Sequence, residues 1–596
     1  MKSSMAVRLL IENKSAWAIL IALVVLLLYW PALEYGYIEI DDGGQVFENP
    51  LVLEWTLRNL KQMFISSVVG MYQPLTSITF AALVTVFGVE ETFSQHLFNV
   101  LLHILNSLLV LLLCKKLFAS TATAGIIALL FAVHPLKVEA VVWLSARSTL
   151  MFGGFFLLAM IFYLRWLQNN SKKTYSLSLL AFIAGGFCKV LILPAVLILP
   201  MLDYLANKKP TDLKLSLAKI PFIVAALVFG FIALRFRSGH AGMPLLPYDE
   251  TWLIAAQILF YPAKLLAPVG LSVVYDWPFA LSWIHYVAWP ILGGLAILVF
   301  CFRANKLMVF GVGFLLANTL LHTVAFSAFL GPYADRYGYL STLGALVALA
   351  ALWPSGTKIA ARRGFYIGCI LAACFSAVTS NQIPHWQNTV AIWSKNLNHQ
   401  TATFSHAMRG ALLYKEGKTQ KALADFQAFD RRPDPRIDLV KLGILYNAMG
   451  TMLAPRSLSQ AQEAFGKALQ ARPDNYDYLI NSAIISQKQG LFEKAESFLN
   501  RAFQVEPNNP QAPLLMARQS ASLGKTKEAN NAYKRAIALG NDNPLTLLEY
   551  AVFLYQANDR DAARETLEQV RRLFKEAGQR AENNPIFSEL DKRLKL

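Results

Sequence analysis

Long apolar stretches follow one another from Ser15 to about Thr379, and they limit the possible fold more than any other feature of the sequence. A stretch of roughly 20 apolar residues is long enough to cross a bilayer as a helix. From about Asn381 onward the sequence is instead polar and rich in helix-forming residues. Only 16% of all residues are charged, against about 25% in an ordinary soluble domain. A single water-soluble fold is therefore excluded.

The first apolar stretch, Ala16 to Leu33, follows basic residues and has no small-residue cleavage site before the acidic segment 34–42. We predict an uncleaved first span with a cytoplasmic N-terminus. The next loop, residues 34–92, then lies on the outer side. Ten further spans are expected, which makes about eleven and puts the polar part outside: 96–114, 121–134, 149–166, 176–189, 190–205, 217–234, 284–302, 307–326, 339–354 and 364–380.

The distribution of basic residues supports this topology. The chain has 55 Lys and Arg against 38 Asp and Glu, a net charge of +17, which by itself would suit a nucleic-acid binder. With eleven spans, however, the basic clusters fall on cytoplasmic loops, as the positive-inside rule expects. We therefore expect the lipid bilayer as a partner and no nucleic acid. These clusters are Lys115–Lys116, Arg165 with Lys172–Lys173, Lys208–Lys209, Arg303 with Lys306, and Lys358 with Arg362–Arg363.

One apolar segment, Trp252 to Val269, does not fit the scheme because it contains Pro262, Lys264 and Pro268. Counting it as a full span would invert everything after it and place the later basic clusters outside. We therefore expect this segment to be re-entrant or to lie along the outer interface, with its backbone buried in protein.

The polar part is a repeat array. Alanines recur every 34 residues at 461, 495, 529 and 563, and a large apolar residue follows each of them by four positions. This period and pattern resemble the tetratricopeptide repeat, in four to five copies over about residues 402–578.

We predict a membrane domain at 1–380, a linker at 381–401 and a repeat domain with a C-terminal helix at 402–596. The concave groove of such a solenoid typically holds a peptide or protein; bracing of the membrane domain or dimerisation is the alternative.

Ionisable residues beside membrane spans are costly, so they are candidates for function. Asp41 and Asp42 lie in the first outer loop, where a carboxylate can accept a hydroxyl proton or bind a hard cation. A solvated loop is the alternative. His96, Asn99 and His103 share one face of the second span, where they serve either a site or an interhelical hydrogen-bond network.

A third polar group begins at the outer end of the third span. His134 and Glu139 could be metal ligands, but a third ligand is missing. Three cations occur on the outer side, where the positive-inside rule would not place them, and they suit a phosphate headgroup. These cations are Arg147, Lys189 and Arg336.

The order of these motifs resembles one known family. The motifs are Asp41-Asp42 with Asn49-Pro50, Gln73-Pro74-Leu75, His96 with Asn99 and His103, His134-Pro135 with Glu139 and Arg147, Cys188-Lys189, Asp335-Arg336-Tyr337 with Tyr339, and Trp386 with Asn388 and Trp393. Together with the repeats they resemble the transmembrane and tetratricopeptide repeat O-mannosyltransferases and their bacterial relatives, over nearly the whole chain.

The resemblance implies an all-α membrane helix bundle of the C-type glycosyltransferase kind followed by the repeat solenoid. It also implies a polyprenyl-phosphate-linked sugar as donor and Asp41 or Asp42 as the catalytic residue. The chain departs from the family pattern at Gln73, Ser148 and Val190. Arg147, Lys189 and Arg336 remain as phosphate-binding candidates, with Gln73, Asp335, Tyr337 and Tyr339 as further site residues.

We therefore predict sugar transfer from the lipid donor to Ser or Thr hydroxyls of an exported protein that the repeats hold. Transfer to a glycan or lipid acceptor and a non-enzymatic scaffold are the alternatives. His134, Glu139, His96, His103, Asn99 and Asp335 would orient the site or, alternatively, hold a metal. Mg²⁺ or Mn²⁺ is compatible with these residues, although no cofactor is firmly implied. The expected location is a bacterial inner membrane, with the repeats in the periplasm.

Overall fold

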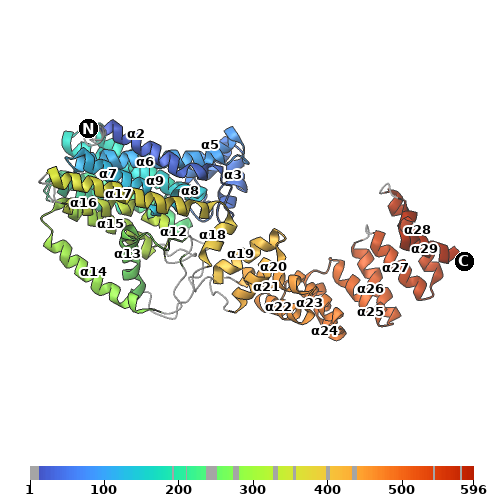
Figure 1. The fold of residues 1–596 in the computed structure, drawn as a ribbon. Coiled ribbons are helices and arrows are strands. Elements are labelled where there is room, and N and C mark those ends of the chain that lie inside the picture. Colours follow the sequence, from blue (N-terminus) through green and yellow to red (C-terminus); the bar gives the residue numbers. More distant parts are fainter. Residues whose placement is uncertain are drawn as a thin grey trace, which may run out of the picture. The chain divides into compact units, whose positions relative to one another are not determined.

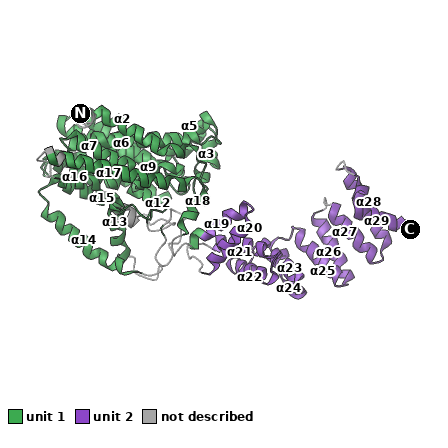
Figure 2. Cartoon of the chain, viewed as in Figure 1, with its two compact units in different colours: residues 1–405 green, residues 406–596 purple. Residues whose placement is uncertain are grey.

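The computed structural model describes residues 13–190, 193–209, 211–236, 251–272, 275, 281–325, 333–353, 358–397, 403–431, 439–540, 544–576 and 580–595. These residues form helices and no β-strand, apart from an isolated bridge between Val68 and Met71. The predicted all-α class is confirmed. The chain divides into two compact units, residues 1–405 and residues 406–596 (Figures 1 and 2), and the first unit includes the segment expected to be a linker.

The described residues of the first unit are mainly helical (Figure 1). In chain order they are α2 (Lys14–Tyr29), η1 (Trp30–Glu34), η2 (Gly43–Phe47), α3 (Pro50–Leu53), α4 (Leu57–Met63), α5 (Pro74–Phe87), α6 (Phe93–Leu117), α7 (Thr121–Val133), η3 (Pro135–Lys137), α8 (Val138–Val142), η4 (Leu144–Ala146), α9 (Arg147–Asn169), α10 (Lys172–Cys188), α11 (Leu193–Leu205), α12 (Leu213–Phe236), α13 (Thr251–Leu266), α14 (Trp283–Cys301), α15 (Lys306–Ala325), η5 (Asp335–Tyr337), α16 (Gly338–Leu352), α17 (Lys358–Gln382), η6 (Ile383–Trp386) and α18 (Thr389–Asn396).

The protein is a multi-pass membrane protein. Six helical segments of the described residues are long and apolar enough to cross a bilayer, and a seventh span results if the bent pair Thr121–Val133 and Pro135–Val142 counts as one. A helix lies at each of the eleven positions expected from the sequence, but the count of eleven spans stays a prediction. The six segments are Lys14–Glu34, Phe93–Leu117, Leu144–Asn169, Leu213–Phe236, Trp283–Cys301 and Arg362–Trp386.

Two further helices bear on the expected topology. The segment Trp252 to Val269, which was expected to be re-entrant or interfacial, contains α13, one of the shorter apolar helices. Helix α5 is another, and it lies inside the first outer loop, where we expected no apolar helix. The placement of both helices relative to the bilayer stays a prediction.

Two glycines bring α15 and α16 into backbone contact. A Cβ atom at Gly311 would lie 2.5 Å from the backbone nitrogen of Ala348, and one at Gly344 would lie 2.5 Å from the carbonyl oxygen of Gly311. Small residues at helix crossings allow such close packing in membrane proteins. The crossing fixes the middle of α16, the helix that follows the short helix η5.

The third predicted span, 121–134, ends where the chain bends at His134. Helices α7 and η3–α8 meet at an angle of 56°. Pro135 explains the break, because proline disfavours a helical conformation in the residue before it. His134 then caps η3, since its side chain accepts a hydrogen bond from the backbone N–H of Leu136. The bend carries the chain through the buried segment 134–147, which contributes several candidate site residues.

The second unit consists of consecutive helix pairs, as the 34-residue period predicts. The repeated alanines 461, 495, 529 and 563 are fully buried. The turn residues Gly490, Gly524 and Asn558, also 34 apart, have φ angles of +75°, +72° and +68°. The helices are α19 (Thr403–Lys415), which begins in the first unit, α20 (Thr419–Asp430), α21 (Leu439–Leu453), α22 (Leu458–Ala471), α23 (Tyr476–Lys488), α24 (Phe492–Val505), α25 (Gln511–Ser522), α26 (Thr526–Leu539), α27 (Pro544–Gln556), α28 (Arg560–Glu576), η7 (Ala581–Asn583) and α29 (Pro585–Lys595).

Replacing Gly450 by Val is expected to destabilise the repeat array. A Cβ atom at Gly450 would lie 2.7 Å from the ring of Phe465, which is buried in the same helix pair. Overpacking of this kind costs about 1–3 kcal/mol, so the midpoint of thermal unfolding of the full chain should fall. Gly466→Val is the matched control, because a Cβ atom at Gly466 meets nothing within 4 Å. Equal midpoints for the two variants would contradict this packing.

Candidate functional site

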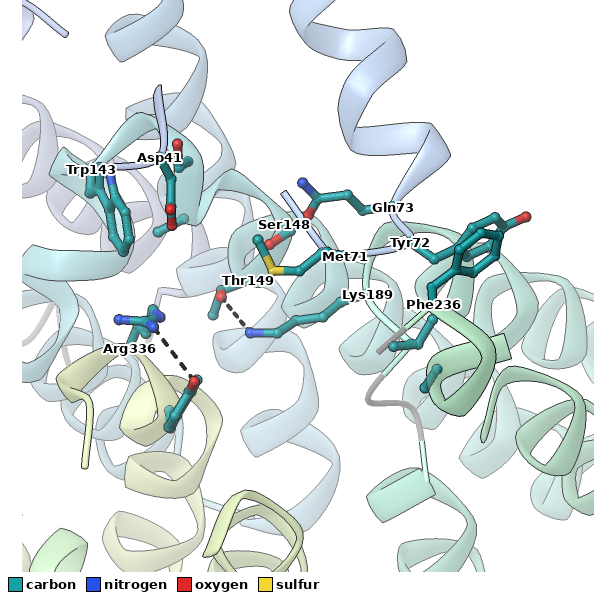
Figure 3. A pocket seen from close by; sticks show the side chains of 16 residues that line it. Asp41, Met71, Tyr72, Gln73, Trp143, Ser148, Thr149, Lys189, Phe236 and Arg336 are labelled. Atoms are coloured by element: carbon teal, nitrogen blue, oxygen red, sulfur yellow. Dashed lines mark hydrogen bonds between the residues drawn. The ribbon is translucent and has the colours of Figure 1, made fainter. Parts of the chain in front are cut away.

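A cavity of about 210 Å³ lies in the first unit (Figure 3). It is lined by Asp41 from the loop between η1 and η2, by residues 70–73 before α5, and by residues from Trp143 to Thr149 around η4. The ends of α10 and α12 and the short helix η5 complete the wall. Residues far apart in the sequence, Asp41, Lys189 and Arg336 among them, therefore share one cavity.

The two adjacent aspartates have different environments. Asp42 is fully buried, and its Oδ2 accepts a hydrogen bond of 2.8 Å from the backbone N–H of Ile38. Its Oδ1 accepts from the backbone N–H of Ser145 at 3.0 Å and from the Ser145 hydroxyl. Burial raises the pKa of Asp42 to about 6, although these hydrogen bonds oppose the rise. Asp42 thus ties the first outer loop to η4, whereas Asp41 lines the cavity.

Two cations line the same cavity as Asp41. The Nζ of Lys189 donates a hydrogen bond of 2.9 Å to Thr149 Oγ1 and lies 5.5 Å from the ring centre of Tyr337. The guanidinium of Arg336 lies 5.1 Å from the ring centre of Trp143 and 4.9 Å from that of Tyr337. Figure 3 shows Lys189 and Arg336 in the wall of the cavity. Lys and Arg side chains around one cavity form a site that can bind a phosphate group.

Glu139 holds Arg336 in place. Its Oε2 accepts a hydrogen bond of 2.7 Å from the backbone N–H of Arg336, and its Oε1 pairs with the guanidinium. The Glu139 side chain is 1% exposed and that of Arg336 is 16% exposed, so water screens this ion pair little. The contacts suit the expected orienting role of Glu139, which stays a prediction.

His134 makes only backbone contacts through its ring nitrogens. Nδ1 accepts from the N–H of Leu136 at 3.2 Å, and Nε2 lies 3.1 Å from the carbonyl oxygen of Leu265. Both nitrogens are therefore engaged, and His134 stabilises the bend between α7 and η3. Among the residues that the structure describes, no three or more His, Cys, Asp or Glu side chains form a group that could hold a metal ion.

Arg147 does not line the cavity. Its Nε donates to Asn99 Oδ1 at 2.8 Å, and its Nη2 donates to the side chain of Gln95 at 2.7 Å. The guanidinium also lies 3.9 Å from the ring centre of Phe80. Because its donors are bonded within the bundle, this placement does not support the expected contact with a donor phosphate.

The histidines of the second predicted span lie in the interior. His103 Nδ1 lies 2.9 Å from the Tyr339 hydroxyl, and its Nε2 lies 2.9 Å from the carbonyl oxygen of Ala132. Asn106 also donates to the Tyr339 hydroxyl, at 3.0 Å. His96 is 2% exposed. None of His96, His103 and Tyr339 lines the cavity. The hydrogen bonds of His103 and Tyr339 favour the interhelical network for these two residues.

Two of the remaining candidates line the cavity and the third, Asp335, does not. Gln73 and Tyr337 are in the wall, and Gln73 donates a hydrogen bond of 3.1 Å to Gln45 Oε1. Asp335, next to Arg336 in the chain, is buried and accepts a hydrogen bond of 2.7 Å from the Tyr275 hydroxyl. Burial, with the nearby Glu139 carboxylate, raises the pKa of Asp335 well above its usual range.

Several residues of the site were not singled out from the sequence. Ser145, which anchors Asp42, and Trp143, which lines the cavity, occur within the His134 to Arg147 motif, so their place in that motif was a usable signal. Tyr72 and Phe236 form an apolar end of the cavity, with rings stacked 5.5 Å apart. Phe236 ends an apolar helix and carried no signal of its own.

Comparison with known proteins adds to this picture. A tetratricopeptide repeat family model matches residues 452–518 and 521–581. The mouse protein O-mannosyl-transferase TMTC3 is 22% identical over 600 residues, with 88% of this chain and 64% of the relative covered. Its human counterpart is 24% identical over 603 residues with the same coverage. The chain is homologous to these TMTC proteins.

As a TMTC homologue, the chain spans somewhat less than two thirds of the length of these relatives. Among solved structures, YrrB, described as a tetratricopeptide repeat protein with an unusual peptide-binding site, is 16% identical, with 34% of this chain and 97% of YrrB covered. The TM-score of that comparison is 0.27, which supports no argument about function.

Proposed function

We propose that this protein is a membrane glycosyltransferase that moves a sugar from a polyprenyl-phosphate donor to Ser or Thr hydroxyls of an exported protein. The observation that carries the proposal is the cavity shared by one carboxylate, Asp41, and two cations, Lys189 and Arg336. The name of the TMTC3 relatives, protein O-mannosyl-transferase, supports transfer to protein and makes mannose the first sugar to test.

The proposed reaction is a single displacement at the anomeric carbon of the sugar. The Asp41 carboxylate takes the proton of the acceptor hydroxyl while the hydroxyl oxygen forms a bond to the anomeric carbon. The bond from that carbon to the phosphate oxygen breaks, and the lipid phosphate leaves with the electron pair. Lys189 and Arg336 stabilise the growing charge on the phosphate, an electrostatic contribution that is commonly the largest in such sites.

Asp41 is the better base of the two aspartates. Asp42 is fully buried and already accepts three hydrogen bonds, which leave its oxygens little capacity for an acceptor hydroxyl. Asp41 lines the cavity. We assign Asp42 the task of holding the loop against η4, so that Asp41 faces the space where donor and acceptor meet.

The repeats would present the acceptor. Tetratricopeptide solenoids commonly bind extended peptides in their concave groove, and an acceptor protein needs such a surface whereas a lipid acceptor does not. We place the N-terminus in the cytoplasm and both the cavity and the repeats on the outer face, in a bacterial inner membrane. The basic loop clusters support this orientation.

The function is tested by incubating the purified full chain with polyprenyl-phosphate carrying radiolabelled mannose and a Ser/Thr-rich peptide. Lys189→Met should raise KM for the donor about tenfold or more, because a lost charged hydrogen bond is worth about 1.5–3 kcal/mol. Lys189→Arg, which keeps the positive charge, is the matched control. Label found on a lipid or glycan other than the donor, and not on the peptide, would favour the glycan or lipid acceptor. No transfer by the wild-type chain would contradict the proposal.

A further inference from the structure

The segment 383–396, called the connector below, leads from α17 toward the first repeat helix, α19. It consists of η6 and α18, and the side chain of Asn388 caps α18 by accepting a hydrogen bond of 2.8 Å from the Ala391 N–H. Ile383, Trp386, Ile392 and Trp393 of the connector are buried. Links between domains are ordinarily exposed and polar, so this burial indicates a role in the first unit itself.

The connector contacts the candidate site at two points. The hydroxyl of Thr389, at the start of α18, accepts a hydrogen bond of 3.0 Å from the backbone N–H of Glu39, two residues before Asp41. The ring of Trp386 packs against Trp143 with centroids 6.0 Å apart, and Trp143 lines the cavity. One contact therefore holds the segment that carries Asp41, and the other supports the cavity wall.

The same connector is fixed at its other end. Trp393 packs edge to face against Phe404, in the first turn of α19, with ring centroids 5.7 Å apart. Asn396, the last residue of α18, accepts a hydrogen bond from the hydroxyl of Ser272. Thr389 therefore belongs to a helix whose position is set by packing along its length, and it can act as a firm support for the Glu39 N–H.

We propose that Thr389 is a positioning residue for Asp41. The Asp41 segment is held from two sides. Asp42 anchors it to Ser145 of η4, and Thr389 anchors it to the connector. Removal of the second anchor leaves Asp41 chemically intact but lets its carboxylate move relative to the cations of the cavity. This inference rests on the proposed function, because it takes Asp41 as the base.

The test compares two substitutions at Thr389 in the full chain. Thr389→Val has nearly the same shape but removes the hydroxyl acceptor, whereas Thr389→Ser keeps it. In the Val variant, deuterium exchange at the Glu39 amide should accelerate about fivefold, the factor that one typical hydrogen bond is worth. With polyprenyl-phosphate mannose and the peptide, kcat should fall by about the same factor while the donor KM stays unchanged. Gln387→Ala, at an exposed neighbouring position, is the matched control.

The inference is supported if the Val variant shows fast exchange and slow turnover and the Ser variant restores both. Unchanged exchange at Glu39, or fast exchange with normal turnover, overturns it. Deuterium exchange at the Glu39 amide does not depend on the sugar or the acceptor. A failure of the Thr389 contact can therefore be distinguished from a failure of the proposed function. Full transfer by Asp41→Asn would remove the proposed base, whatever the result at Thr389.

Discussion

Asp41→Asn is expected to lower the rate of sugar transfer by at least about 100-fold, because general base catalysis contributes roughly 10²–10⁴ to the rate. The amide has nearly the same size as the carboxylate but cannot accept the hydroxyl proton. Donor binding should change little, since Lys189 and Arg336 remain in the cavity. The measurements are single-turnover transfer to the peptide and equilibrium binding of the labelled donor.

Asp42→Asn is the contrasting variant, and we expect it to act on stability. An amide can accept hydrogen bonds only through its oxygen, so its NH₂ group would face a donor that the native carboxylate satisfies. Each buried donor left without a partner costs about 1–3 kcal/mol. The thermal midpoint should fall for Asp42→Asn and stay near the wild-type value for Asp41→Asn. If Asp42→Asn were stable and inactive while Asp41→Asn remained active, our assignment of the two residues would be reversed.

Glu139→Gln is expected to weaken both the fold and donor binding. The substitution leaves the largely buried Arg336 without its anionic partner, and breaking a buried ion pair in this way costs several kcal/mol. Because the Arg336 side chain keeps slight exposure, we expect a loss of about 2–4 kcal/mol in unfolding free energy. The guanidinium should also lose its orientation, and the donor KM should rise about tenfold, which corresponds to about 1.4 kcal/mol.

Thermal unfolding in detergent and donor titration check these two effects of Glu139→Gln. The exposed Glu54→Gln removes the same charge elsewhere in the first outer loop and is the matched control. A stable Glu139→Gln variant with normal donor binding would show that Arg336 does not depend on Glu139. A loss of activity restored by added Mg²⁺ or Mn²⁺ would instead favour the metal role that the sequence left open.

The helical elements and the repeats follow from local sequence. The buried alanines of the array recur at the predicted positions, and Gly490 and Gly524 occupy left-handed turns at the same period. Helix periodicity and turn residues are local properties, so they can be read without knowledge of the fold. Helix α5 was missed because residues 34–92 were assigned to an outer loop from the number and orientation of the spans. The apolar composition of residues 74–87 was not considered by itself.

The candidate site could be read from the sequence only as a set of residue types. Carboxylates, histidines and cations beside apolar spans were identified because the bilayer makes such residues costly. Their partners lie far away in the chain. Glu139 forms an ion pair with Arg336, and Asn99 accepts a hydrogen bond from Arg147. In each pair the two residues belong to different helices, and no sequence motif predicts how those helices pack. Of the three predicted cations, Lys189 and Arg336 line the cavity and Arg147 does not; the phosphate-binding role of all three stays a prediction.

By itself the sequence determined the all-α class, the division into an apolar and a polar part, the 34-residue array and the residues worth testing. These features depend on composition and short-range periodicity, which can be read from the sequence without knowing which residues are in contact in the folded protein. Only the tertiary structure decided that Asp41 lines the cavity while Asp42 is buried against Ser145, and that the connector reaches Glu39. Adjacent residues of one type differ only in what packs around them, and that packing is set by segments distant in the chain.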